Sequence, residues 1–272
     1  YGATPQGGFL RSTDGGTNWS SAQGGMSGTA AWVAPWHQDP ATATTLYAGR
    51  SQMWRSTNSG VSWTQLTVTG GSGTIVDFAI APSNNQVLYV IHGNTLFKTI
   101  NGGTAWTNVS TGLPGNLTYV AIDPTDPNNA WVTASGYTAG NKVYMTTNGG
   151  TAWTNVSSNL PNLPANCIVY EPGTSDRVYV GMDVGVYYKD NSSPNWTLYN
   201  TGLPNVPIAD LEMSPANPGK IFAATYGRGA WKVDVVTAAP PTTSFSVAAS
   251  ALCTGSTIQF NDNSSNSPTS WS

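Results

Sequence analysis

Charged residues are scarce in this chain of 272 residues. They make up 8% of the sequence, against about 25% in a typical soluble domain. The net charge is −3, and the basic stripes that mark nucleic-acid-binding proteins are missing. No apolar run approaches the ~18 residues that a membrane helix needs. We therefore expect neither a nucleic-acid partner nor a membrane span.

Cysteine and histidine are scarcer still. The two cysteines, Cys167 and Cys253, fall in segments of different character and are not expected to pair. The two histidines, His37 and His92, show no zinc-ligand spacing with each other or with a cysteine. The run Asn261-Asp262-Asn263 offers oxygen ligands of the kind that Ca²⁺ takes, but a polar turn explains it more simply. No metal or other cofactor is therefore predicted.

Aromatic and turn-forming residues are plentiful instead. The chain has 11 Trp, 12 Tyr, 6 Phe, 30 Gly and 18 Pro. So many aromatic rings must be buried, which is unlike a disordered chain. The frequent Gly and Pro leave no room for long helices. Abundant Thr, Asn and Gly with few Lys and Glu are typical of extracellular proteins, and the fold class that these features predict is all-β.

A segment of eight residues that ends in tryptophan recurs five times. The tryptophans follow one another at intervals of 44, 43, 47 and 43 residues, and they are Trp19, Trp63, Trp106, Trp153 and Trp196. Each copy, called a box below, has an acidic or amide residue at its third position, namely Asp14, Asn58, Asn101, Asn148 and Asn191. The fifth copy lacks the glycines of the others. A period of this length marks a repeat protein.

The residues of the box predict a hairpin turn. Asn-Gly and Asp-Gly between apolar stretches favour tight turns, because Gly accepts positive φ angles without steric cost. The Asp or Asn side chain can accept hydrogen bonds from turn amides, and the preceding Ser or Thr adds another local bond. We expect the Trp to begin the next strand and to bury its ring under the turn.

A second pattern lies between the boxes. In five places a Pro precedes a pair of apolar or aromatic residues by six positions, as Pro40 precedes Leu46-Tyr47. Each unit thus contains four short strands: one that ends at the Pro turn, one with the apolar pair, one before the box and one after its Trp. Four strands in about 40–45 residues predict one blade of a β-propeller.

These repeats resemble known ones. The boxes resemble the Asp-box, or bacterial neuraminidase repeat, of pattern Ser/Thr-x-Asp-x-Gly-x-x-Trp, although four of the five copies carry Asn in place of Asp. The whole unit is similar to the blades of sortilin-type receptors, xyloglucanase-type glycoside hydrolases and photosystem assembly factors. The resemblance covers residues 1–236 and implies a propeller of four-stranded blades in which the boxes are structural turns.

The chain changes character after the repeats. A Pro-rich linker at 237–243 leads to residues 244–272, which alternate as β-strands do. This part resembles the start of a polycystic-kidney-disease (PKD) type Ig-like sandwich, as in large secreted or surface proteins of Bacteroidetes-type bacteria. The residues that fit the pattern are Cys253, Gly255, Ile258, Phe260, Asp262, Ser264 and Trp271. A sandwich needs about 100 residues, so we expect the module to continue beyond Ser272.

The count of blades also predicts a longer chain. Residues from about 28 to 199 contain four full blades, and 206–236 contain three strands of another. The segment from Gly8 to Ser21 supplies a third and a fourth strand. The fourth strand of this segment could complete the last blade, but its third strand would then belong to no blade. We therefore expect further blades upstream of Tyr1.

Ligand-binding side chains are expected on one face of the propeller. Loops between the second and third strands share this face with the connections between blades, and the boxes lie on the opposite face. The candidates on the first face, at equivalent points of different blades, are Arg50, His92, Asp183, Tyr226 and Arg228.

The inner strands offer a second set of polar residues. Aligning these strands on their Pro brings one set to a common position: Pro35, Asp77, Tyr119, Cys167 and Asp210. A neighbouring position is shared by His37, Ala79, Ala121, Val169 and Glu212. Polar groups are therefore predicted to converge near the central channel.

Two hydrolase families offer catalytic alternatives. A sialidase needs an arginine triad, but Arg11 and Arg55 directly precede boxes, and the Arg-Ile-Pro segment typical of that family is absent. A xyloglucanase-type enzyme uses two Asp residues, one in a segment that residues 182–188 resemble. Asp183 and Asp210 would then form the pair, about 6.5–9.5 Å apart for an inverting reaction. The simpler interpretation is that Asp183 is a turn residue.

Binding is the function that the sequence favours. We expect a secreted or cell-surface propeller that adheres to, or recognises, a glycan or protein ligand and is joined to further domains of the same chain. A glycoside hydrolase is the alternative.

Overall fold

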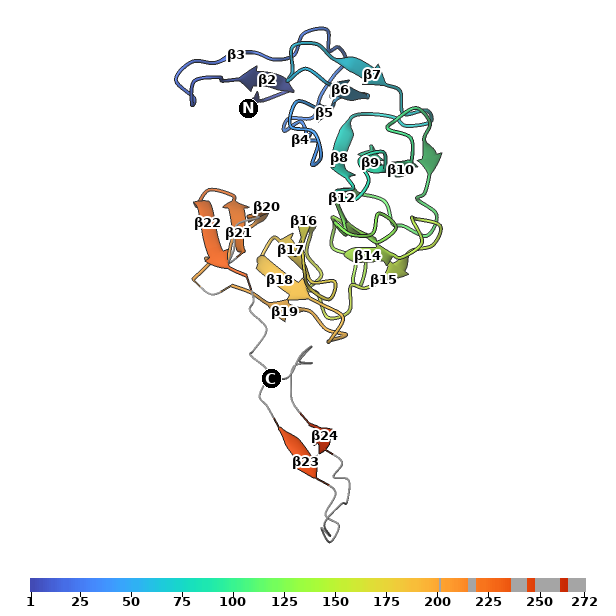
Figure 1. Cartoon of the computed structure of the whole chain (residues 1–272), viewed down its shortest axis with the longest axis vertical. Helices are drawn as coiled ribbons and strands as arrows, with labels where there is room; N and C mark the ends of the chain where they lie inside the picture. The colour runs from blue at the N-terminus through green and yellow to red at the C-terminus, as the bar shows by residue number, and fades with distance from the viewer. Residues whose placement is uncertain (201, 215–218, 236–243, 248–259, 264–272) are drawn as a thin grey trace, which may run out of the picture.

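The computed structural model describes residues 1–200, 202–214, 219–235, 244–247 and 260–263. This part of the chain contains strands and turns but no helix. Six antiparallel sheets follow one another around a common centre as a six-bladed β-propeller (Figure 1). The prediction of an all-β propeller with four-stranded blades is confirmed.

Four blades have four strands each, paired in sequence order. Blade 2 contains β4 (Trp36–Gln38), β5 (Leu46–Gly49), β6 (Met53–Ser56) and β7 (Thr64–Leu66). Blade 3 contains β8 (Ile75–Ile80), β9 (Leu88–His92), β10 (Thr95–Thr99) and β11 (Thr107–Asn108). Blade 4 contains β12 (Leu117–Ile122), β13 (Ala130–Ala134), β14 (Val143–Thr146) and β15 (Thr154–Asn155). Blade 5 contains β16 (Ala165–Tyr170), β17 (Val178–Met182), β18 (Gly185–Lys189) and β19 (Thr197–Leu198). The first strand of each lies nearest the channel.

The two end blades have three described strands each. Blade 6 contains β20 (Ile208–Ser214), β21 (Lys220–Thr225) and β22 (Gly229–Asp234). Blade 1 contains β1 (Gly2–Thr4), β2 (Gly8–Arg11) and β3 (Ser20–Ser21). The sequence predicted only the last two strands of blade 1. The added strand β1 pairs with β2 through a tight turn in which Gln6 and Gly7 have positive φ angles.

A separate hairpin follows the propeller. It pairs β23 (Phe245–Val247) with β24 (Phe260–Asp262). Asn261 and Asp262 therefore lie in a strand, and the prediction of a polar turn for them is wrong. The linker 237–243 and most of the expected PKD-type pattern lie outside the described residues, namely Cys253, Gly255, Ile258, Ser264 and Trp271.

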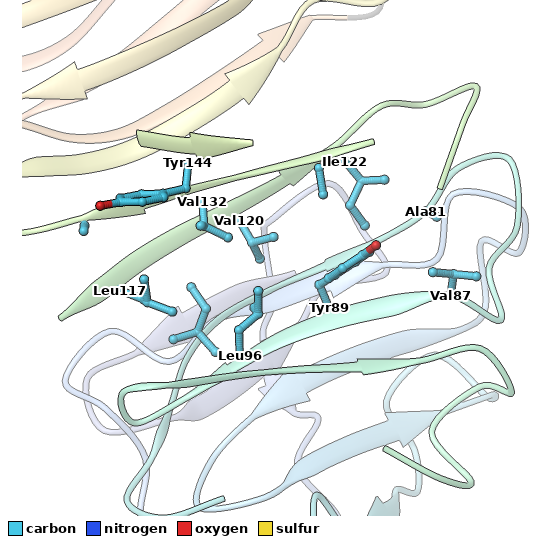
Figure 2. Close-up of a cluster of buried hydrophobic side chains, with 12 residues drawn as sticks. Ala81, Val87, Tyr89, Leu96, Leu117, Val120, Ile122, Val132 and Tyr144 are labelled. Atoms are coloured by element: carbon cyan, nitrogen blue, oxygen red, sulfur yellow. The ribbon is translucent and has the colours of Figure 1, made fainter. Parts of the chain in front are cut away.

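The apolar core lies between the blades. Five clusters of buried side chains each join one sheet to the next. In the cluster between blades 3 and 4, Tyr89 and Leu96 of blade 3 pack against Val120, Ile122 and Val132 of blade 4 (Figure 2). Burial of one such side chain contributes about 1.5–3 kcal/mol. None of the five clusters, which comprise described residues only, joins blade 6 to blade 1.

The first four boxes fold into the same hydrogen-bonded turn. The hydroxyl of the first residue accepts from the amide of the fifth, a glycine, at 2.8–3.1 Å in Ser12, Ser56, Thr99 and Thr146. The Oδ1 atom of the third residue accepts from the amide four residues later at 2.9 Å in Asp14, Asn58, Asn101 and Asn148. Donors from Asn18 and Ser12 lower the pKa of Asp14 to about 2. Since Asn makes the same bonds, the departure from Asp preserves the turn.

Three of the five box tryptophans bond their blade to the one before it. The indole Nε1 atoms of Trp63, Trp153 and Trp196 donate to carbonyl groups of the preceding blade at 2.7–2.8 Å. Trp19 has no such partner, donates to Gly16 within its own turn and is 48% exposed. The expectation of a buried ring is therefore wrong for Trp19, and each strand begins one residue after the Trp and not at it.

The fifth box uses a different residue. Asn191 donates its backbone amide to Ser175 and its side-chain amide to Asp176. Asp190 accepts the turn hydrogen bonds from the amide and hydroxyl of Ser192. Asp190, and not the predicted Asn191, thus holds the place of the third residue, because this copy has one more residue before Trp196.

We expect Asn101→Ala to lower the free energy of unfolding by about 1 kcal/mol, because the amide of Ala105 and the hydroxyl of Thr99 lose their acceptor. Denaturant unfolding followed by tryptophan fluorescence measures this. Asn101→Asp is the control and should retain stability, since Asp14 makes the same bonds. Equal losses in both variants would show that the turn bonds do not stabilise the blade.

Candidate ligand-binding site

Hydrogen bonds define the two faces of the propeller. Box turns bond to the proline turns between the first and second strands, as the amide of Gly102 does to Gln86 and that of Gly149 to Asn128. This side is called the box face. Loops between the second and third strands bond instead to the connections between blades, as Gly93 does to Thr74. This side is called the loop face, and the separation of the two faces follows the prediction.

Arg50 on the loop face is tied into the fold. Its Nη2 atom donates to the carbonyl of Gly7 at 2.6 Å and to Oε1 of Gln23 at 3.1 Å, and Nη1 donates to the carbonyl of Gly28 at 3.2 Å. Burial lowers the pKa of Arg50. The guanidinium therefore connects blade 2 to blade 1 and to the segment between them.

His92 is also part of the fold. It is the last residue of β9 and is fully buried, with Nε2 3.2 Å from the carbonyl of Gly73. A Cβ atom at Gly71 would lie 1.9 Å from Nδ1, so the connecting loop requires a glycine there. Burial lowers the pKa of His92, which favours the neutral ring. The side chain fills the space under the connection between blades 2 and 3.

The other three predicted residues divide into two groups. Asp183 accepts from Nδ2 of Asn166 at 3.0 Å, and the same Nδ2 donates to the carbonyl of Ile208 at 3.1 Å. Asp183 thus orients a side chain that links blade 5 to blade 6. Tyr226 and Arg228 are exposed in the turn between β21 and β22. Of the predicted set, these two have the side chains most accessible to a ligand.

The inner strands bulge at one repeated position. In blades 3 to 6 the pairing register shifts directly before Asp77, Tyr119, Cys167 and Asp210. A bulge bends the strand and redirects the side chains that follow it. Two of the bulged residues hold the next blade: Thr118 donates to the carbonyl of Ala165 at 2.7 Å, and Asn166 donates to the carbonyl of Ile208 at 3.1 Å.

Polar side chains meet in the channel beyond these bulges. His37 of blade 2 lies 3.9 Å from the carboxylate of Asp77 of blade 3, which also accepts from the amide of Val120 at 2.9 Å. The hydroxyl of Tyr119 in blade 4 donates to Asp210 in blade 6 at 2.9 Å. Glu212 is exposed to the channel and accepts no hydrogen bond from the described residues. We call His37, Asp77, Tyr119, Asp210 and Glu212 the channel cluster.

Burial sets the ionisation of the channel cluster. Desolvation raises the pKa of Asp77 and of Asp210, against opposing contributions from His37 and Tyr119. Desolvation and the charge of Asp210 raise the pKa of Glu212. Burial disfavours protonated His37, but the nearby carboxylates outweigh it and raise its pKa. Three carboxyl groups thus face one imidazole.

A hollow of about 310 Å³ extends along the channel from this cluster. At the box face it ends at four residues of the proline turns, Pro40, Pro82, Pro124 and Pro172. Its walls include Phe78, Tyr119, Ile168, Leu211 and Glu212. We call this space the central hollow. The sequence predicted polar groups in the channel but placed the ligand on the loop face.

The two Asp residues of the hydrolase alternative have separate partners. Asp183 is held by Asn166 and Asp210 by Tyr119. Asp183 is on the loop face, whereas Asp210 belongs to the channel cluster. Among the described residues there is also no group of three or more His, Cys, Asp or Glu side chains placed to hold a metal ion. Nor does this part of the chain contain a helix that could cross a membrane.

Comparison with known proteins supports the fold. The family described as sortilin, neurotensin receptor 3, matches residues 51–167. The chain is similar to sortilin-type propellers. No curated protein matches it. An ancestral GH74 enzyme is 20% identical with a TM-score of 0.68 over 85% of this chain, which spans only 34% of the enzyme's chain.

Two further structures cover most of the propeller. YCF48 bound to D1 peptide is 16% identical with a TM-score of 0.56, over 86% of this chain and 76% of that one. A chain of the nidogen/laminin complex is 12% identical with a TM-score of 0.63, over 85% and 87%. At these identities the likeness shows the shared fold.

We expect Tyr119→Phe to lower the free energy of unfolding by about 1.5–3 kcal/mol at pH 7, because a partly buried carboxylate loses a donor. The lost bond lets the already raised pKa of Asp210 rise further. The folded state then holds its proton more tightly than the unfolded state, so the variant loses stability as pH rises through that pKa. Denaturant unfolding at pH 4 and pH 7 should therefore show the smaller cost at pH 4.

The matched control for this experiment is Tyr144→Phe. The hydroxyl of Tyr144 donates to Oδ1 of Asn141 at 2.9 Å, and the amide side chain of Asn141 carries no charge. Its cost should be the same at both pH values. A cost for Tyr119→Phe that is equally independent of pH would show that Asp210 does not carry the effect.

Proposed function

We propose that this chain is a binding propeller of a secreted or cell-surface protein, and that it holds a protein ligand in the central hollow. The hollow carries the proposal, because inner strands of five blades form its walls and it ends at the box face. Binding sites are typically concave, mostly apolar and provided with a few directed polar groups. The channel cluster supplies such groups.

The composition and the family match support the extracellular part of the proposal. Few charged residues and many Thr, Asn and Gly are typical of extracellular chains, and residues 51–167 match the sortilin family. One structural neighbour, YCF48, is described as bound to a peptide. These likenesses make a peptide segment the first ligand to test.

A glycan on the loop face is the second candidate. Three aromatic side chains are strongly exposed in loops of that face: Trp32 at 69%, Tyr137 at 72% and Tyr226 at 79%. Exposed aromatic rings together with Arg228 provide flat surfaces and donors that suit a sugar ring. The ligand would then lie on the face that the sequence predicted. Trp32 and Tyr137 would contact it in place of Arg50, His92 and Asp183, whose side chains make contacts within the fold.

Display of random peptides followed by calorimetry on the selected sequences tests the proposal. Ala79 and Val169 line the hollow, so Ala79→Phe/Val169→Phe should fill it and weaken a selected peptide by at least about tenfold. Tyr226→Ala/Arg228→Ala on the loop face is the matched control and should leave the affinity unchanged. Thermal unfolding of both variants confirms that they fold.

Other outcomes decide between the alternatives. A peptide that binds the filled variant as well as the wild type contradicts the proposal. Glycan-array binding that is lost only in the loop-face variant supports the glycan candidate. Hydrolysis of a β-glucan that disappears in Asp183→Asn supports the hydrolase, with Asp183 and Asp210 as its catalytic pair.

A further inference from the structure

The central hollow is lined by negative charge without a fixed positive counterpart. None of its lining residues is Lys or Arg, and Glu212 lies among them. Two more carboxyl groups lie directly behind lining residues: Asp77 is paired with His37, and Asp210 accepts a hydrogen bond from Tyr119. His37 is therefore the one basic group that these three carboxyl groups share.

Glu212 differs from the other two carboxyl groups. Asp77 accepts from the amide of Val120, and Asp210 accepts from Tyr119 and from the amide of Leu211. Glu212 accepts no hydrogen bond from the described residues and is exposed to the hollow. A ligand that enters the hollow thus meets an unpaired carboxylate, with two paired ones behind it.

The walls suit the stem of a long basic side chain. Ala79 and Val169, which are only partly buried, provide apolar surface between the channel cluster and the proline turns. Lysine and arginine pack their methylene stems on such surface while the charged end reaches polar groups. The ring of Tyr119, which is only partly buried, can also face a cation. A volume of about 310 Å³ is far larger than a bare metal ion requires.

We propose that the central hollow binds a lysine or arginine side chain of the protein ligand, inserted from the box face, an inference that rests on the proposed function. The ligand segment lies across the proline turns, and its basic side chain follows the apolar wall to Glu212 and Asp210. Charge complementarity selects this occupant over acidic or neutral side chains.

Ionisation of the cluster gives this binding a pH dependence. The pKa values of Asp77, Asp210 and Glu212 are raised, so these groups gain negative charge as pH rises above the usual carboxyl range. His37, whose pKa is also raised, loses its positive charge over the same rise. Tyr119 and Cys167, which face the same groups, have pKa values raised well above their usual ones and stay neutral. Affinity for a cation therefore increases with pH.

Capped pentapeptides of the form acetyl-Gly-Gly-X-Gly-Gly-amide test the inference. Here X is Lys, Arg, norleucine or Glu, and binding to the whole chain is followed by NMR titration. We expect the Lys and Arg peptides to bind at least about tenfold more tightly than the norleucine peptide, and the Glu peptide to bind most weakly. Affinity for the Lys peptide should rise from about pH 5 to pH 8.

Two substitutions test whether Glu212 and Asp210 attract the basic side chain. Glu212→Gln, and separately Asp210→Asn, should reduce the preference for Lys over norleucine to less than about threefold. Asp14→Asn is the matched control, because it removes the same charge from a box whose other copies already carry Asn. It should leave the preference unchanged. Both channel substitutions keep an oxygen acceptor in place, and thermal unfolding confirms the fold.

The possible failures are distinguishable. Equal affinity of the four peptides, with shifts at the hollow, overturns the inference and leaves the proposed function standing. No binding of any peptide up to about 10 mM overturns both. Butylamine that binds as tightly as the Lys peptide shows that the site takes a free amine, which overturns the assignment to a protein side chain. Unchanged preference in Glu212→Gln and Asp210→Asn also overturns it.

Discussion

A sheet of three or four short strands cannot bury its own faces, so each blade depends on the blades beside it. The five apolar clusters all lie between successive sheets. Three of the box tryptophans strengthen the same contacts by donating hydrogen bonds from one blade to the preceding one. In the fourth box, a Cβ atom at Gly150 would lie 2.8 Å from Val109 of the preceding blade. The glycine is therefore needed for blade packing as well as for the turn, where its φ angle is +88°.

The channel follows from this packing. Because the blades are held edge to edge around a centre, their inner strands face one another, and residues at equivalent positions come together. Tyr119 and Asp210 are 91 positions apart in the sequence and belong to blades 4 and 6, yet they share a hydrogen bond. The bulges before Asp77, Tyr119 and Asp210 bring these side chains to the same level of the channel. A polar cluster at the centre is thus built from strands that have no contact in the unfolded chain.

Sequence reasoning located this cluster but misjudged the role of two candidates on the loop face. The alignment of inner strands placed Asp77, Tyr119 and Asp210 at one position, because the repeat period is regular enough to count. The same counting placed Arg50 and His92 on the loop face correctly but could not show what they contact. Arg50 bonds to blade 1 and His92 fills a space beside Gly71, and both depend on the approach of a neighbouring connection. For His92 a signal was present in Gly71, which allows that approach.

The sequence by itself determined the repeated unit, its four strands, the turn chemistry of the first four boxes and the all-β fold. These depend on residues near one another in the chain, where Asn, Gly and Ser or Thr form local hydrogen bonds. Only the tertiary structure decided that three of the tryptophans bridge blades, that Asp190 replaces Asn191 in the fifth box, and that the hollow ends at the box face. Each of these depends on which distant segment lies alongside, and that is settled by the packing of whole blades against one another.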